Sequence, residues 1–195
     1  QFEQGLLTRK KETIRELGQT VCSILQRYAE QVDRGELALD EAQRRALATV
    51  RVLRYGEDRK DYFWINDLEP RMVLHPYRPE LEGRSLVDYE DPEGKRLFRE
   101  AVRIAKRDGG GYIRYRWQWK DDPSRVVPKL SYVKLFEPWG WVIGTGLYVE
   151  DARREVNAIT DRLAYATGGI LVVIVFLSGY VIRRGYVIES TQKRT

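Results

Sequence analysis

The chain has 195 residues, of which 43% are hydrophobic and 32% are charged, a composition typical of a folded protein with one domain and additional helices. Its net charge is +5, but basic and acidic residues are interleaved along the sequence, which argues against a nucleic-acid-binding protein. The single cysteine, Cys22, excludes an intramolecular disulfide and any zinc site built on cysteines.

The N-terminal region predicts a long helix. Apolar residues recur at steps of three and four, which indicates one apolar seam: Ile14, Leu17, Val21, Ile24 and Tyr28. Gly35 is expected to end this helix. The seam either packs on the helix's own domain or pairs with the same seam in a second copy of the chain, and both arrangements are compatible with the sequence.

A second helix is predicted before residue 56. Asp40 stands at a position suited to an N-cap, with Gln43 three residues later in a capping-box position. The expected inner face is formed by Ala42, Ala46, Val50 and Leu53.

From Tyr62 the hydrophobic period changes to two. Tyr62–Asn66 and Met72–His75 are predicted strands joined by a turn, and residues 77–94 form a long irregular connection. Residues 95–106 follow as a short amphipathic helix. Three further strands are then predicted at Tyr112–Trp119, Val126–Phe136 and Trp141–Tyr148. The short turns between them indicate antiparallel neighbours, so the sequence predicts an α+β domain with a five-stranded antiparallel sheet.

A transmembrane helix is predicted at Leu163–Ile182, which is 20 residues long and carries no charge. Arg183 and Arg184 follow it directly, and this positive charge places residues 1–162 outside the cytoplasm. The predicted organisation is a helical region at 1–56, a ligand-binding sheet domain at 57–149, an exit helix at 150–162, the membrane helix at 163–182 and a cytoplasmic stub at 183–195.

No catalytic device is recognisable. His75 is the only histidine and has no nucleophile motif beside it. Gly144-Thr-Gly146 lacks the third glycine of a dinucleotide fingerprint, and Gly109–Gly111 lacks the Lys-Ser/Thr of a phosphate loop. We therefore expect a binding module and not an enzyme, with no metal and no cofactor.

Aromatic residues with polar tips gather near His75 and Lys129, a combination that suits a small pocket for a polar ligand. Strand alternation places Tyr115 and Trp117 on the inner face of their strand, either in a pocket or simply in the core. Lys129 and Tyr132 lie an odd step apart, so a regular strand separates them. A bulge near Pro128 would bring them to one face.

Five motifs in order resemble the single Cache domain, an extracytoplasmic sensor module of bacterial chemoreceptors and histidine kinases. They are Tyr-Phe-Trp-Ile-Asn-Asp, His-Pro-x-x-Pro-x-Leu-x-Gly, Gly-Gly-Gly-Tyr, Pro-Lys-Leu-Ser-Tyr-Val-Lys and Pro-Trp-Gly-Trp-Val-Ile-Gly-Thr-Gly-Leu-Tyr. The resemblance covers about residues 5–162. It implies a PAS-like sheet, an N-terminal helix that forms a homodimer, and a bacterial inner-membrane protein.

The resemblance also implies a pocket for a small organic acid such as acetate, propionate, pyruvate or lactate. Carried onto this sequence, the ligand-binding residues are Trp64, His75, Tyr115, Trp117, Lys129 and Tyr132. One alternative ligand is an amine, an amino acid or urea, but an amine site needs a buried carboxylate and this set contains none. A second alternative is a structural dimerisation stalk that binds no ligand.

Overall fold

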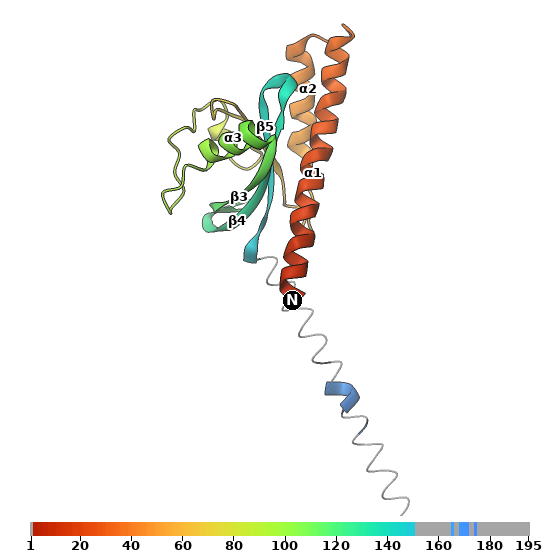
Figure 1. The fold of residues 1–195 in the computed structure, drawn as a ribbon, viewed down its shortest axis with the longest axis vertical. Helices are drawn as coiled ribbons and strands as arrows, with labels where there is room; N and C mark the ends of the chain where they lie inside the picture. The colour runs from red at the N-terminus through yellow and green to blue at the C-terminus, as the bar shows by residue number, and fades with distance from the viewer. Residues whose placement is uncertain (1, 151–164, 166–167, 172–173, 175–195) are drawn as a thin grey trace, which may run out of the picture. The chain divides into compact units, whose positions relative to one another are not determined.

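The computed structural model describes residues 2–150, 165, 168–171 and 174 (Figure 1). The chain divides into two compact units, residues 1–152 and 153–195, and the first contains the sheet. The predicted exit helix beyond Glu150, most of the predicted membrane helix and the predicted cytoplasmic stub lie outside the described residues. Within the described ranges, no helix has both the length and the apolar character needed to cross a membrane.

The predicted five-stranded antiparallel sheet is confirmed. Its order is β2-β1-β5-β4-β3, so the last strand lies in the centre of the sheet. The strands are β1 (Phe63–Asp67), β2 (Met72–Leu74), β3 (Gly110–Trp119), β4 (Asp122–Phe136) and β5 (Trp141–Tyr148). The period-two alternation located each strand, while β4 begins four residues earlier than predicted because the turn before it is tight.

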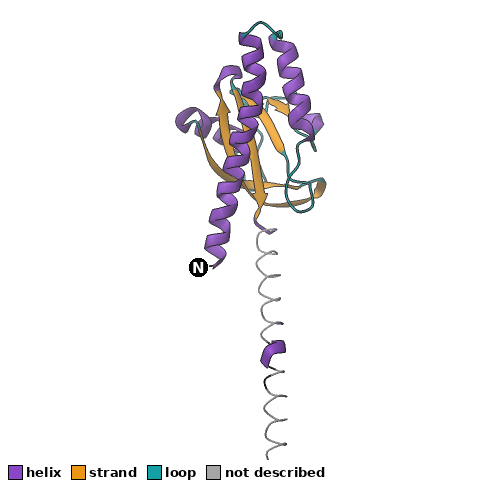
Figure 2. Ribbon diagram, turned by 90° about the vertical axis from the view of Figure 1, so that its right-hand side faces the viewer, coloured by secondary structure: helices purple, strands orange, loops and turns teal. Residues whose placement is uncertain are grey.

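Helices cover both faces of the sheet. α1 (Phe2–Asp33) and α2 (Leu39–Val52) lie side by side on one face, where α1 contacts β4 and β5 (Figures 1 and 2). α3 (Leu97–Asp108) covers the opposite face together with the connection of residues 75–96, which contains the short 3-10 helix Pro79–Leu81. Each face therefore has its own apolar core, and the sheet separates the two.

α1 packs on its own domain along a stripe that differs from the predicted seam. The buried positions are Ile14, Gly18, Val21, Leu25 and Ala29, whereas Leu17, Ile24 and Tyr28 are only half-buried. The buried stripe advances by four, three, four and four residues. A straight helix on a sheet follows its own 3.6-residue period, while the predicted seam has the 3.5-residue period of a coiled coil. A homodimer through α1 remains a prediction.

The start of α2 differs from the prediction. The N-cap residue is Ala38, whose side chain makes no capping hydrogen bond, and Asp40 lies inside the first turn. The predicted capping box was therefore wrong. Acidic side chains in a first turn still interact favourably with the helix dipole, which accounts for Asp40 and Glu41 there. The predicted inner face is confirmed at Ala42, Ala46 and Val50, all fully buried.

Candidate functional site

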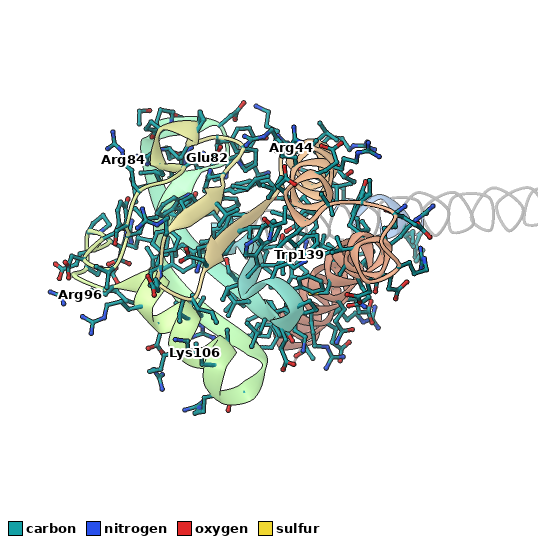
Figure 3. All side chains as sticks on the ribbon, turned by 90° about the horizontal axis from the view of Figure 1, so that it is seen from above. Arg44, Glu82, Arg84, Arg96, Lys106 and Trp139 are labelled. Atoms are coloured by element: carbon teal, nitrogen blue, oxygen red, sulfur yellow. The ribbon has the colours of Figure 1, made fainter. Side chains whose placement is uncertain are left out.

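An interior cavity lies between the sheet and the layer formed by α3 and the 75–96 connection. The gaps among its side chains total about 160 Å³ and leave no space for a molecule of water size, so the cavity is closed in this structure. It is lined by Tyr62, Trp64, His75, Leu97, Phe98, Tyr115 and Trp117. Arg84, Arg96 and Lys106 point outward from the covering layer (Figure 3). That layer therefore presents charge to solvent and apolar side chains to the cavity.

Two glycines of β5 make the sheet surface beneath this cavity. A Cβ atom at Gly144 would overlap the indole ring of Trp64, and one at Gly146 would overlap the hydroxyl of Ser131. Thr145 between them faces the other side of the sheet, where its Oγ1 donates to the carbonyl of Tyr62 at 2.8 Å. The Gly-Thr-Gly motif, which the sequence analysis discounted as half a dinucleotide fingerprint, therefore lets the Trp64 ring and the Ser131 hydroxyl lie directly on β5.

Three buried polar atoms around the cavity have no hydrogen-bond partner among the described residues. They are Nε1 of Trp64, Nε1 of Trp117 and the hydroxyl of Tyr62. The Tyr62 hydroxyl lies near Trp117 and Tyr148 but forms no hydrogen bond of acceptable geometry with either. Because an unpaired buried donor costs about 1–3 kcal/mol, three on one cavity favour an acceptor-rich ligand.

His75 is buried and neutral. Its Nδ1 accepts a hydrogen bond from the backbone N–H of Tyr77 at 3.3 Å, so the ring proton lies on Nε2, which is a donor. Burial holds the pKa of His75 well below its ordinary value, and the positive charges of Lys129 and Arg78 lower that pKa further. The backbone N–H of His75 donates to Glu82 Oε1 at 2.9 Å, which fixes the start of the connection.

Lys129 is a buried cation beside the cavity, with only 2% of the residue exposed. Its Nζ stands 4.1 Å from the ring centre of Tyr62, 4.8 Å from that of Tyr148 and 5.5 Å from that of Trp64. No carboxylate lies within ion-pair distance of this nitrogen in the described part of the chain. Burial lowers the pKa of Lys129 from 10.5 to about 7; the negative charge of Asp61 partly offsets this and Lys120 adds to it.

The structure brings five of the six predicted site residues together. Trp64, His75, Tyr115 and Trp117 line the cavity, and Lys129 lies over the faces of two lining rings. The hydroxyl of Tyr115 is already hydrogen-bonded to Ser131 at 3.0 Å, so this residue offers the cavity its ring face.

Tyr132, the sixth, lies apart from the other five, on the opposite face of the sheet. β4 pairs with β3 in regular register from Val126 to Lys134, so no bulge forms near Pro128. The odd step from Lys129 therefore sends Tyr132 to the opposite face. There its ring packs on Gly18 of α1 and stands 5.1 Å from that of Tyr112.

Sequence reasoning missed four residues of this site: Tyr62, Leu97, Phe98 and Tyr148. Tyr62 could have been found, since strand alternation places it on the same face as Trp64. Leu97 and Phe98 belong to α3, and only the packing of that helix on the sheet shows which of its apolar residues reach the cavity.

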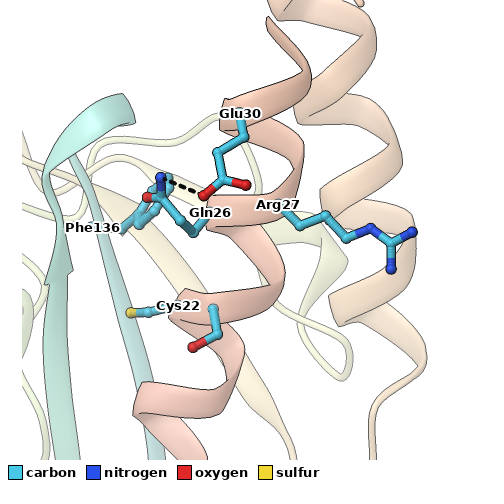
Figure 4. A pocket seen from close by; sticks show the side chains of 6 residues that line it. Cys22, Gln26, Arg27, Glu30 and Phe136 are labelled. Carbon is cyan, nitrogen blue, oxygen red and sulfur yellow. Dashed lines mark hydrogen bonds between the residues drawn. The ribbon is translucent and has the colours of Figure 1, made fainter. Parts of the chain in front are cut away.

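Two larger hollows lie open on the surface. One, with about 690 Å³ of empty space, is bordered by Cys22, Ser23, Gln26, Arg27, Glu30 and Phe136 (Figure 4). The other, with about 990 Å³ of empty space, runs along the outer side of α3 and is bordered by Pro70, Val87, Lys95, Arg96, Arg99, Glu100, Val102 and Arg103. None of the residues bordering either hollow carries an unpartnered buried side-chain donor. The interior cavity is therefore the better candidate for a specific ligand site.

The family model for the single Cache domain 2 matches residues 6–162, and the chain belongs to this family. It is 43% identical over 155 residues to the methyl-accepting chemotaxis protein McpP of Pseudomonas putida. This match covers 80% of this chain and 28% of McpP. It is also 32% identical over 150 residues to the sensor histidine kinase MctS of Rhizobium johnstonii. That match covers 77% of this chain and 31% of MctS.

A solved structure described as the structural basis for carboxylic acid recognition by a Cache chemosensory domain is also similar. It is 40% identical with a TM-score of 0.70, and the match covers 75% of this chain and 97% of that one. The chain spans about three-tenths of the length of the curated relatives named above. These matches define residues 6–162 as a Cache sensor domain of the kind found in chemotaxis receptors and sensor histidine kinases.

Proposed function

We propose that this chain is the extracytoplasmic ligand-sensing part of a bacterial inner-membrane receptor and that it binds a small organic carboxylate. The cytoplasmic output is that of a chemoreceptor or of a histidine kinase, since relatives of both kinds match. The predicted membrane helix at 163–182 would anchor the domain, and the charge after it supports an extracytoplasmic position.

The observation that carries the proposal is the set of hydrogen-bond donors around one cavity. The indole N–H groups of Trp64 and Trp117 lack partners, Nε2 of His75 carries a proton, and the Lys129 ammonium has no carboxylate in contact. No residue lining the cavity is acidic. A carboxylate offers about four acceptor sites and one negative charge, which this set of donors matches. The solved relative described by carboxylic acid recognition supports the same ligand class.

The size and polarity of the cavity support a short monocarboxylate. The gaps of about 160 Å³ leave no water-sized space, so the lining side chains must move apart to admit a ligand, which favours a small acid of two to four carbons over a larger one. Leu97 and Phe98 from α3 border the cavity with apolar groups. A second carboxylate placed there would be buried without a partner.

The test is a binding screen of the purified chain by thermal shift, followed by calorimetry. The panel contains acetate, propionate, pyruvate and lactate, the dicarboxylates malonate and succinate, and propylamine, alanine and urea. A monocarboxylate at about 100 times its Kd should stabilise the domain by about 2.7 kcal/mol. Binding of the amine, the amino acid or urea alone would favour the alternative ligand class, and binding of no compound would favour a structural stalk.

A further inference from the structure

The hydroxyl of Tyr148 uses its full hydrogen-bonding capacity beside the candidate site. It donates to the carbonyl of Gln118 at 3.0 Å and accepts from the backbone N–H of Lys120 at 2.9 Å and from Lys129 Nζ at 3.3 Å. A phenolic oxygen has one proton and two lone pairs, so these three bonds fix its orientation. Its partners belong to the end of β3, to the turn that follows and to β4.

For Lys129, this hydroxyl is the one hydrogen-bond acceptor that Nζ reaches within the described part of the chain. An ammonium group has three N–H donors, so two remain for other partners. Tyr62 and Trp64, whose ring faces Nζ also approaches, line the cavity. The bond to Tyr148 thus determines where a flexible four-carbon side chain places its charge.

We propose that Tyr148 is a positioning residue of the acid site: its hydroxyl, anchored to the β3–β4 turn, holds the Lys129 ammonium where a bound carboxylate can meet it. The inference rests on the proposed function. Tyr148 does not contact the acid in this arrangement; it acts by holding Lys129 in place. The β3–β4 turn contributes indirectly, because its hydrogen bond to the Tyr148 hydroxyl orients that hydroxyl.

Other ionisable groups face Lys129, so a test that uses pH must consider them. Asp61 and Lys120 act on it by charge, and Tyr62 and Tyr148 approach it with their rings. His75 lies within the influence of the same charge, and its pKa is already well below the ordinary value. Burial holds the pKa values of Tyr62 and Tyr148 above the ordinary value of a phenol. Lys129 is therefore the group expected to change charge between pH 6 and pH 9.

The experiment compares Tyr148→Phe with Tyr55→Phe in the full chain. Tyr55 is a matched control because its hydroxyl also bonds to β5, at Thr145 and at the carbonyl of Gly146, without contacting Lys129. Propionate affinity is measured by calorimetry from pH 6 to pH 9. We expect Tyr148→Phe to weaken binding about 10-fold to 100-fold, as loss of a hydrogen bond to a charged group does.

The pH profile separates positioning from general damage. Tyr148→Phe removes support for the ammonium form, so its affinity should begin to fall at a lower pH than that of the unmodified chain. Tyr55→Phe should keep the affinity and the profile. Replacing Tyr148 by 3-fluorotyrosine, which keeps the hydroxyl but makes its oxygen a poorer acceptor, should produce a smaller change in the same direction and is the readout if Tyr148→Phe does not fold.

Unchanged affinity and an unchanged pH profile for both Tyr148 variants would overturn the inference, as would an equal effect of Tyr55→Phe. If the unmodified chain binds no acid, the proposed function itself is wrong, and that result is visible before any variant is compared.

Discussion

Replacement of Lys129 by methionine is predicted to stabilise the domain at neutral pH while abolishing acid binding. Methionine has a similar length and suits an aromatic surrounding, so the cage of Tyr62, Trp64 and Tyr148 should accept it. The positive charge of buried Lys129 lowers the free energy of unfolding. A pKa lowered from 10.5 to about 7 means that the folded state carries the ammonium form at a cost on the order of 4–5 kcal/mol at pH 7.

The sign of the pH dependence follows from proton counts. Between pH 7 and pH 10.5 the unfolded chain keeps its proton on Lys129 while the folded chain releases it, so the unfolded state binds more protons. The free energy of unfolding of the unmodified chain should therefore rise with pH in this window, by about 2 kcal/mol from pH 7 to pH 9. That rise corresponds to an increase in Tm of about 4–8 °C.

The assay is thermal unfolding from pH 6.5 to pH 9 with and without propionate. The Lys129→Met variant should show a higher Tm than the unmodified chain at pH 7, little pH dependence in this window and no response to the acid. Lys134→Met is the matched control, since Lys134 lies on the same strand, an odd number of residues away and half-buried. A Tm for Lys129→Met below that of the unmodified chain at pH 7, together with a flat profile for the unmodified chain, would refute the reasoning.

Three further predictions concern affinity and packing. Acetate has four non-hydrogen atoms and is limited to about 6 kcal/mol of binding free energy, or a Kd of tens of micromolar, so nanomolar binding by calorimetry would contradict the cavity assignment. Gly144→Ala should displace the Trp64 ring and weaken acid binding at least about tenfold, whereas Gly5→Ala, whose new Cβ meets nothing within 4 Å, should leave it unchanged; equal affinities would count against the packing of Trp64 on β5. Burial raises the pKa of Cys22 from 9.0 to about 11, so alkylation at pH 8 should be about 100-fold slower than for a thiol of pKa 9.0, and an equal rate would show that α1 does not pack on its domain in this way.

The sheet could be predicted from the sequence because its strands alternate with a period of two over long stretches. That alternation also placed Ile113, Tyr115 and Trp117 on the buried face of β3. The start of α2 was harder to predict. An acidic residue such as Asp40 is common both at the N-cap and inside the first turn of a helix, so its presence does not fix the first residue of α2. Boundaries depend on the geometry of single residues, while whole elements depend on many.

The candidate site was predictable only in part, because its residues come from elements far apart in the chain. Lys129 and Trp64 were identified from the residues that the family resemblance carries, and the fold brings them together through the pairing of β1 and β4 with β5. The inclusion of Tyr132 rested on the same resemblance, although the strand period already separated it from Lys129. Gly144 has no side chain, so its contribution became visible only when the Trp64 ring was seen to occupy the space above it.

The central claim is that a small carboxylate binds in the cavity and accepts hydrogen bonds from its two indole N–H groups. The most direct measurement is a ¹⁵N–¹H NMR titration of the labelled chain with propionate, following the indole signals of the five tryptophans and assigning them with single Trp→Phe variants. The account predicts that the signals of Trp64 and Trp117 move downfield and saturate together, while those of Trp119, Trp139 and Trp141 stay in place. Saturable binding of propionate that leaves the Trp64 and Trp117 signals unmoved would contradict it.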